Sequence, residues 1–307
     1  MSDKFDELVT EQTVPMHYHF NMLNDSTHLQ AFKEAIDHVV KPGDRVLDLG
    51  GGTGVLSFMA AQHAAQVTYV ERDAGLVVAA RQTISKNKNG DRVKIVHADV
   101  NDYLPLEPVD VVICEMLHVG MLLEQQMAVM DSFKQRYQEK FAGKLPRFIP
   151  EACIQAVQPV EQDFCFEGYY APNTLFQVPT ITQDKTVQLA PPEIFQLFAY
   201  DEAIPQRCEC DQRITIATDG KLNAVRIITK NILAILLDEQ RNVEWFNQYL
   251  VVPLDQSLQV KAGDEISLRF SYLPGAQLDA LAGSLQVTVV NVVRESQKRA
   301  QSIQHVG

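Results

Sequence analysis

The chain has 307 residues, of which 46% are hydrophobic and 21% are charged, and its formal net charge is −12. These values are typical of a globular protein with one large domain or two of ordinary size. The acidic balance disfavours a protein that holds nucleic acid by bulk charge, because that mode of binding needs a basic surface. The composition is still compatible with a local basic patch.

The first residues, MSDKFDELVTEQ, are acidic and polar, which excludes a signal peptide of the usual kind. No apolar run approaches the ~18–20 residues that a membrane-spanning helix requires. The five cysteines are odd in number and irregularly spaced, which suits a reducing compartment better than a disulfide framework. The sequence therefore predicts a cytoplasmic protein without a membrane partner and without a metal site, since Cys208-Glu-Cys210 has no second Cys or His pair at zinc spacing.

The first predicted helix begins at Asp25 or Ser26, either of which can act as its N-cap. Phe32 and Ile36 then recur on one helical face, and Pro42 follows the last helical residues. After this helix, strand and helix signals alternate along the chain, a pattern typical of a parallel sheet covered by helices. The predicted strands are 45–49, 67–70, 93–97 and 109–114, and the predicted helices are 54–63, 74–89 and 121–141.

The sequence changes character where Pro146 and Pro150 lie close together. Helical periodicity largely ends there. Short runs of β-type residues follow, separated by turns that contain Pro, Gly, Asn and Asp, as in an antiparallel sandwich or barrel. These runs are 153–157, 213–217, 224–229, 232–237, 249–252, 265–272 and 285–293. The predicted fold is therefore an α/β, Rossmann-like domain over residues 1–150, followed by an antiparallel β-barrel or sandwich domain over residues 151–307.

A glycine-rich turn follows the first predicted strand, which carries Asp48 near its end. Gly50, Gly52 and Gly54 are spaced GxGxG, and glycines at such a turn let the backbone bend tightly and let a ligand approach closely. A dinucleotide fingerprint, GxGxxG, requires glycine at the next position, where this chain has Val55. The turn therefore favours a ligand that has a nucleoside and an amino-acid part but no phosphate, as S-adenosyl-L-methionine has.

Further candidate ligands for this cofactor stand at the ends of the next two strands. Glu71 closes the second strand, about 20 residues past the glycines, where a carboxylate can accept both ribose hydroxyls. Asp99 and the backbone of Val100 follow the third strand and can meet an adenine edge. Ligands bind at the carboxyl ends of the strands in sheets of this type. These residues, together with Asp48 and the glycine turn, predict S-adenosyl-L-methionine as the cofactor.

Two glutamates follow the fourth predicted strand, Glu115 and Glu124, nine positions apart. Two carboxylates suit a planar guanidinium, whose N–H donors form a fork that matches them, and such a clamp can aim one nitrogen at a reactive methyl group. Glu124 also fits the start of the predicted long helix, which favours acids, so the spacing leaves both interpretations open. His118, between the glutamates, is a candidate proton acceptor near the methylated atom.

Together these residues resemble the protein arginine methyltransferases, and the resemblance runs from about residue 17 to residue 270. Glu71 matches the family's ribose-binding acid. Four segments also carry the resemblance: Val46–Ser57, Ile113–Glu124 with its two glutamates, Met22–Asp25 and Phe148–Pro150. The resemblance implies a class I methyltransferase that depends on S-adenosyl-L-methionine. It also implies that the fold has a methyltransferase domain and a β-barrel with the substrate groove between them, and that Glu115 and Glu124 are catalytic.

The chain departs from the family's pattern at several positions. The family's N-terminal tyrosine-rich motif has no match in Val9–His17. His28 stands where the family has an arginine that holds the cofactor's carboxylate, a role for which the imidazole would have to be protonated. The family's threonine-histidine-tryptophan loop reads Val243-Glu-Trp245, and the segment 160–194 is short for the family's dimerisation arm.

The sequence therefore predicts an N-methyltransferase that acts on a guanidino group or another nitrogen of a protein, a peptide or a small molecule, with a second copy of the chain as a further candidate partner. The first alternative is an RNA methyltransferase. The acidic balance and the segment Cys114-Glu-Met-Leu117, which lacks an Asn/Asp-Pro-Pro-aromatic motif, count against it. The second alternative is a cofactor-binding protein without catalysis, which the missing tyrosines and His28 favour.

Overall fold

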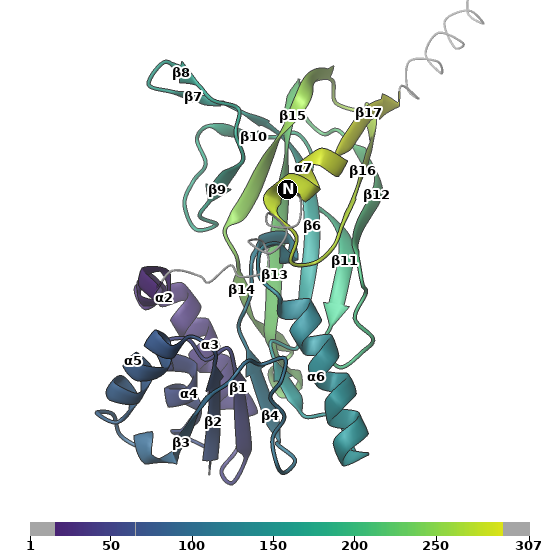
Figure 1. The fold of residues 1–307 in the computed structure, drawn as a ribbon. Coiled ribbons are helices and arrows are strands. Elements are labelled where there is room, and N and C mark those ends of the chain that lie inside the picture. The colour runs from purple at the N-terminus through teal and green to yellow at the C-terminus, as the bar shows by residue number, and fades with distance from the viewer. Residues whose placement is uncertain (1–15, 65, 291–307) are drawn as a thin grey trace, which may run out of the picture. The chain divides into compact units, whose positions relative to one another are not determined.

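The computed structural model describes residues 16–64 and 66–290, and the chain forms two compact units (Figure 1). The first unit consists of the residues up to Glu115 together with Val129–Glu151 and Ile232–Trp245, and the second of Met116–Ala128, Ala152–Asn231 and the residues from Phe246 onward. The division of the chain at residue 150 stays a prediction. None of the described helices is long and apolar enough to cross a membrane.

The first unit contains a five-stranded parallel sheet in the order β3-β2-β1-β4-β5. The strands are β1 (Arg45–Leu49), β2 (Gln66–Glu71), β3 (Val93–His97), β4 (Val111–Cys114) and β5 (Arg147–Ile149). Every residue of β4 is buried, as expected for a central strand of a sheet with both faces covered. The parallel order confirms the predicted Rossmann-like α/β fold, and it gathers the carboxyl ends of these strands along one edge of the sheet.

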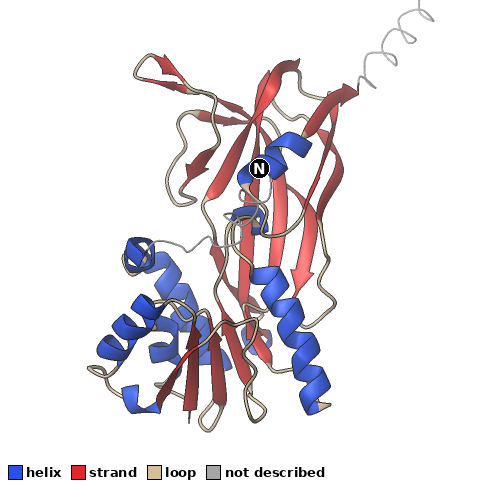
Figure 2. Ribbon diagram, in the orientation of Figure 1, coloured by secondary structure: helices blue, strands red, loops and turns tan. Residues whose placement is uncertain are grey.

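Helices α2 (Met16–Met22), α3 (Ser26–Val39), α4 (Val55–Ala60) and α5 (Ala74–Ile84) flank this sheet in the same unit (Figure 2). The predicted N-cap of α3 is confirmed, because the side chain of Asp25 accepts a hydrogen bond from His28 N at 2.9 Å. Phe32 and Ile36 are buried, as their spacing predicts. Helix α5 ends earlier than predicted, and the short helix η1 (Gly90–Arg92) follows it.

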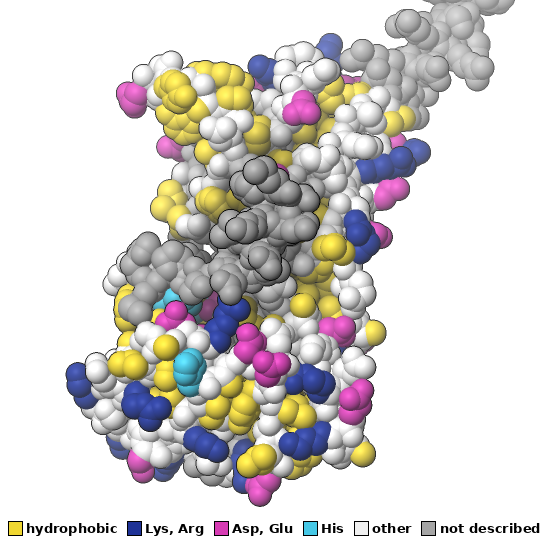
Figure 3. Space-filling model, viewed as in Figure 1, with side chains coloured by type: hydrophobic (Ala, Val, Ile, Leu, Met, Phe, Trp, Pro, Cys, Tyr) yellow, Lys and Arg dark blue, Asp and Glu magenta, His cyan; other side chains and the backbone are white. Residues whose placement is uncertain are grey.

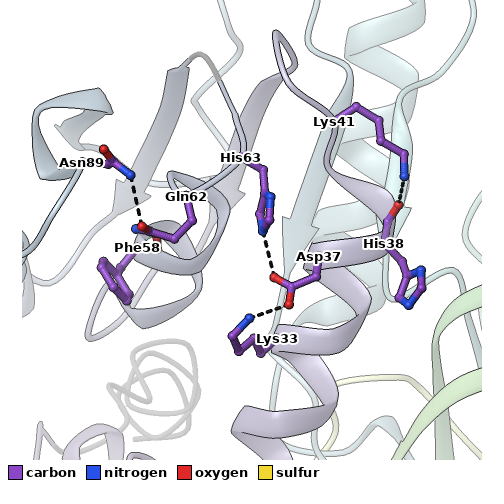
Figure 4. A network of polar contacts seen from close by, with 8 residues as sticks. All are labelled: Lys33, Asp37, His38, Lys41, Phe58, Gln62, His63 and Asn89. Atoms are coloured by element: carbon purple, nitrogen blue, oxygen red, sulfur yellow. Dashed lines mark hydrogen bonds and ion pairs between the residues drawn. The ribbon is translucent and has the colours of Figure 1, made fainter.

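Polar contacts fix α3 against the turn that follows α4 (Figure 4). Asp37 of α3 accepts a hydrogen bond from His63 Nε2 at 2.8 Å and pairs with Lys33. Gln62, the residue before His63, donates through Nε2 to the carbonyl of Phe58 at 3.0 Å. Such exposed pairs contribute little stability each. They do, however, join the helix that follows the glycine turn to the helix that carries His28.

The predicted helix 121–141 is wrong at its start, because α6 spans Gln126–Phe141. Gly120, Met121 and Leu123 have φ values of +67°, +55° and +60°, and a right-handed helix excludes positive φ. Glu124 therefore lies in a loop before α6 and not on the helix.

The second unit is mostly antiparallel sheet. Its principal sheet has seven strands along the path β10-β6-β13-β15-β9, with β11 paired to β6 and β14 to β13, and a three-stranded sheet follows the order β12-β16-β17. The end of β13 from Ile232 onward and β14 up to Trp245 are counted with the first unit. The strands are β6 (Ala152–Gln162), β7 (Cys165–Phe166), β8 (Tyr169–Tyr170), β9 (Leu175–Gln177), β10 (Thr186–Gln188), β11 (Glu193–Ala199), β12 (Cys208–Thr215), β13 (Gly220–Leu236), β14 (Arg241–Phe246), β15 (Tyr249–Val260), β16 (Glu265–Tyr272) and β17 (Gln286–Val290), with helix α7 (Leu278–Ser284) before β17. The predicted antiparallel β-domain is confirmed. The predicted strands 224–229 and 232–237 are one strand, β13.

Side chains join the two ends of the seven-stranded path. Gln177 of β9 donates through Nε2 to Thr186 Oγ1 of β10 at 2.7 Å and to Gln162 Oε1 of β6 at 3.0 Å. Because β9 and β10 are the terminal strands of the path, these bonds require the sheet to curl back on itself, as strands do in a barrel.

Candidate functional site

The glycine turn lies at the carboxyl end of β1 and leads into α4. Gly50, Gly52 and Gly54 have φ values of +74°, +53° and +83°, a region that other L residues rarely adopt. The N–H of Gly50 donates to the carbonyl of Val70 at 2.9 Å, which ties the turn to the end of β2. A Cβ at Gly54 would lie 2.7 Å from Ile84 Cδ1. The turn therefore requires glycine for its conformation and, at Gly54, also for space.

Glu71 at the end of β2 is oriented by the backbone of this turn. Its Oε2 accepts from Gly52 N at 3.1 Å, and its Oε1 accepts from Asp73 N at 2.8 Å. A carboxylate oxygen has two lone pairs, so each oxygen keeps one that a further hydroxyl donor can use. The fixed carboxylate therefore fits the predicted pair of ribose hydroxyls.

Asp48 on β1 is almost fully buried, with 1% of its surface exposed. It accepts a hydrogen bond from Ser57 Oγ at 2.6 Å. The pKa of Asp48 is raised to about 6, mainly by burial and also by the negative charge of Glu71, against the opposing effect of the hydrogen bond from Ser57. Asp48 therefore fixes the first turn of α4, which follows the glycine turn, through its hydrogen bond with Ser57.

Asp99 and Val100 follow β3, where the sequence predicts an adenine contact. Asp99 Oδ1 accepts from Asn101 N at 2.8 Å, which closes a local turn. The carbonyl of Val100 accepts from Arg136 Nη2 at 3.2 Å. These bonds fix the loop, and the adenine contact itself stays a prediction.

His28 and Glu115 approach each other in the first unit. His28 Nε2 lies 3.8 Å from Glu115 Oε1. The imidazole also contacts the rings of Phe32 and Trp245, with centroids 4.7 and 4.8 Å away. Burial lowers the pKa of His28 to about 4, although the charge of Asp25 opposes the shift. The imidazole is therefore neutral at neutral pH and lacks the charge of the arginine that the resemblance implies at this position.

His19 on α2 is a residue of this region that the sequence does not predict as part of the site. A Cβ at Gly52 would lie 3.3 Å from His19 Nδ1, so the imidazole borders the glycine turn. Its position between His17 and His28 is visible in the sequence, but the spacing alone does not show which histidine reaches the turn. The predicted absence of the tyrosine-rich motif falls largely on residues outside the described part of the chain.

His118 belongs to the second unit, in the loop that precedes α6. Its Nδ1 lies 3.1 Å from the carbonyl of Val119, and because a carbonyl only accepts, this contact assigns the ring proton to Nδ1. The lone pair is then on Nε2. Burial lowers the pKa of His118. The ring also packs edge-on against Phe176, with centroids 5.8 Å apart. His118 is therefore a neutral imidazole with a fixed tautomer.

Glu124 lies in the same loop and is half-buried. Burial raises the pKa of its carboxyl to about 7. Its own N–H donates to the carbonyl of Leu122 at 2.6 Å. Within the described residues the carboxylate of Glu124 forms no ion pair. A half-buried carboxyl of this kind favours a cationic ligand with N–H donors, because both the charge and the hydrogen bonds would stabilise its ionised form.

Comparison with known proteins identifies the class of this chain. Residues 46–138 match a methyltransferase domain family, a segment that includes the glycine turn, Glu71, Asp99 and both glutamates. The chain contains a methyltransferase domain and is a methyltransferase that depends on S-adenosyl-L-methionine, which confirms the predicted enzyme class and cofactor.

Individual similar proteins indicate which methyltransferases the chain resembles. The chain is 28% identical over 272 residues to an uncharacterized protein of Methanothermobacter thermautotrophicus, and the match covers 87% of this chain and 97% of the relative. It is 32% identical over 111 residues to a probable protein arginine N-methyltransferase 6.1 of Oryza sativa subsp. indica, which covers 36% of this chain and 29% of the relative. The structure of the Trypanosoma brucei PRMT1 enzyme–prozyme heterotetramer with AdoHcy matches with a TM-score of 0.68 at 14% identity, over 89% of this chain and 98% of that chain. The chain is thus similar to protein arginine methyltransferases, as its motifs predict.

Proposed function

We propose that this chain transfers a methyl group from S-adenosyl-L-methionine to a guanidino nitrogen, with Glu115 and Glu124 holding the acceptor. The observation that carries the proposal is the half-buried carboxyl of Glu124, whose pKa burial raises to about 7. A guanidinium offers the positive charge and the paired N–H donors that such a carboxylate lacks. The similarity to protein arginine N-methyltransferases supports the same acceptor chemistry.

The residues around the glycine turn fit the cofactor. Glu71 keeps a free lone pair on each carboxylate oxygen, and Gly54 leaves no room for a side chain. Both ring nitrogens of His28 are buried without a hydrogen bond, and such orphaned atoms indicate a missing ligand or water. We propose that the neutral His28 donates one hydrogen bond to the cofactor's carboxylate. When bound, the cofactor supplies an electrophilic methyl group on a sulfonium.

The chain's own residues would then do three things. Glu115 and Glu124 would hold the planar acceptor so that one nitrogen is oriented for attack, which is the main contribution that positioning makes. Their negative charge would stabilise the cation that forms on that nitrogen. Nε2 of His118, with its free lone pair, would accept the proton that the methylated nitrogen releases.

Incubation with radiolabelled cofactor tests this proposal. We expect label in cell protein or in a guanidino compound, and loss of at least about 100-fold in rate on Glu124→Gln or Glu115→Gln. Glu193→Gln, which changes an exposed glutamate at the start of β11, is the matched control and should leave the rate unchanged. Label that enters only RNA, with Glu124→Gln as active as the wild type, would reject the guanidinium acceptor.

A second candidate function is a cofactor-binding protein that does not transfer the methyl group. The neutral state of His28 favours it, because the cofactor's carboxylate then meets no charge at that position. This candidate predicts that the wild type binds S-adenosylhomocysteine in calorimetry but gives no labelled product from protein, RNA or small-molecule pools.

Self-association is a further part of the proposal. Hydrophobic side chains gather over the β7–β8 hairpin (Figure 3), where Tyr169 and Tyr170 are 73% and 62% exposed, and exposed apolar patches commonly mark interaction sites. We propose a second copy of the chain as the partner, consistent with the heterotetramer of the T. brucei relative. Sedimentation should give a dimer for the wild type and a monomer for Tyr169→Ser/Tyr170→Ser. A wild-type monomer at high concentration would reject the proposal. We also propose a cytoplasmic location, which the five free cysteines support.

A further inference from the structure

The loop that carries His118 and Glu124 is held at its centre by the peptide groups of Gly120. The N–H of Gly120 donates to Thr229 Oγ1 at 2.7 Å, and the hydroxyl of Tyr272 donates to the carbonyl of Gly120 at 2.7 Å. Thr229 and Tyr272 are 0% and 2% exposed. Two buried hydroxyls from β13 and β16 therefore hold one residue of the loop from both sides.

The Thr229 hydroxyl is itself fixed in direction. It donates its single proton to Gln155 Oε1 at 2.8 Å, and Gln155 Nε2 in turn donates to Cys153 Sγ at 3.0 Å. Because the proton is committed to Gln155, a lone pair of Thr229 points toward Gly120. A buried chain of bonds such as this specifies one arrangement, since any partly satisfied alternative is costly.

Further bonds hold the loop on either side of Gly120. Asn247 Nδ2 donates to the carbonyl of Leu117 at 3.0 Å, and it is oriented by Asn231, whose Nδ2 donates to Asn247 Oδ1 at 2.8 Å. Beyond Gly120, the carbonyl of Met121 accepts from the N–H of Gly275 at 2.7 Å. The loop is thus anchored within the second unit before and after the residue that Thr229 and Tyr272 hold.

The backbone of this loop is in an unfavourable conformation. Met121 and Leu123 have φ values of +55° and +60° although neither is glycine. Such conformations persist only where the surroundings over-determine them, and they are concentrated at functional sites. At Gly120, a Cβ would lie 3.1 Å from the Tyr272 hydroxyl. The contacts to β13 and β16 therefore account for a conformation that the sequence of the loop does not favour.

We propose that Thr229 and Tyr272 are positioning residues that hold His118 and Glu124 in the arrangement the acceptor needs. The inference rests on the proposed function for the roles of His118 and Glu124. Neither hydroxyl would contact the acceptor. Each acts through the Gly120 peptide, which lies between the two functional residues in the chain.

Thr229→Val and Tyr272→Phe test the proposal, since each removes one hydroxyl and preserves the shape of the side chain. Thr229→Val leaves the N–H of Gly120 buried without its acceptor. We expect kcat to fall about tenfold or more and KM for the acceptor to rise, because small displacements of a catalytic group are costly. Cofactor affinity should stay unchanged, since the cofactor residues belong to the first unit. Thr229→Ser, which restores the hydroxyl, should recover the rate.

A second measurement does not depend on activity. The carboxyl carbon of Glu124, assigned in an NMR titration by its absence in Glu124→Gln, should titrate near the raised pKa in the wild type and closer to the ordinary value of glutamate in both variants, as the loop opens to water. Thr186→Val and Tyr200→Phe are matched controls that remove a hydroxyl elsewhere in the same unit. Equal effects of the controls, or an unchanged Glu124 titration together with unchanged kinetics, would overturn the proposal. If the wild type transfers no methyl group at all, the proposed function fails and the titration alone decides this inference.

Discussion

Nε2 of His28 lies 3.8 Å from Glu115 Oε1, yet the two side chains do not form an ion pair at neutral pH, because burial lowers the pKa of the imidazole to about 4. His28 is 3% exposed and both of its ring nitrogens lack a hydrogen bond. A neutral imidazole therefore stands at the position where the resemblance to protein arginine methyltransferases implies a charged arginine.

His28→Arg should therefore strengthen binding of S-adenosylhomocysteine. A guanidinium adds a charge-assisted hydrogen bond to the ligand's carboxylate, which is about twice as strong as a neutral one, so we expect Kd to fall about tenfold. Calorimetry measures the change, with His38→Arg on the same helix as the control. 5′-Methylthioadenosine, which has no carboxylate, should show no gain, and an equal gain with this compound would contradict the assignment.

The rate should depend on pH through Glu124. The pKa of its carboxyl is raised to about 7 by burial, so the carboxylate that a guanidinium requires is formed only as pH rises through 7. We expect kcat/KM to increase with pH up to about one unit above that pKa and then to level off. Glu124→Gln should remove this titration along with most of the activity. A profile that falls as pH rises from 6 to 8 would be incompatible with an ionised Glu124.

Asp48 should make stability depend on pH with a defined sign. Its pKa in the folded state is raised from 3.8 to about 6, so folding favours the protonated carboxyl. The contribution to stability is complete below the unfolded pKa and is lost as pH rises through 6. Asp48→Asn mimics the protonated form and removes this titration. Compared with the wild type, the variant should therefore gain more free energy of unfolding at pH 8 than at pH 4, by on the order of 2 kcal/mol. Urea unfolding at the two pH values measures the difference, and an equal effect at both would exclude this explanation.

Two glycine substitutions separate backbone strain from steric overlap. Gly54→Ala adds both, since φ is +83° and the new Cβ would lie 2.7 Å from Ile84 Cδ1, whereas Gly43→Ala adds strain only, at φ of +95° with open space around the Cβ. We expect a loss of about 1 kcal/mol for Gly43→Ala and about 2–4 kcal/mol for Gly54→Ala. Only Gly54→Ala should weaken cofactor binding, since Gly43 is remote from the turn. Equal losses in both measurements would argue against the steric effect.

The parallel sheet of the first unit is well predicted by the sequence, because each of its strands is defined by residues that are neighbours in the chain. The runs that form β1 and β3 are bounded by turn residues, and their predicted limits match the structure. The positions of Asp48, Glu71 and Asp99 are predictable for the same reason, since each lies at or just beyond the carboxyl end of a strand and parallel strands end at the same edge of the sheet. Their contacts with the cofactor stay a prediction. The contact of Glu71 with Gly52 is a direct consequence of this arrangement.

The loop before α6 could not be predicted in the same way. Met121 and Leu122 continue the apolar pattern of a helix, and only contacts with distant residues exclude that conformation. Thr229 and Tyr272 lie 109 and 152 positions from Gly120 in the chain. The break between the predicted strands 224–229 and 232–237 has a similar origin, because Asn231 looks like a turn residue but is buried and bonded to Asn247.

The curl of the seven-stranded sheet depends on the side chains of Gln177, Gln162 and Thr186. Closure by side chains leaves most of the intervening segment, residues 178–184, without a role in joining the strands, because the hydrogen bonds of Gln183 and Ile181 are local. Insertions in that segment would lengthen a surface loop at a small entropic cost, because loop closure depends only weakly on length. The amide of Gln177 thereby gives this β-domain a place where evolution or protein engineering can add a new binding element while the sheet keeps its form.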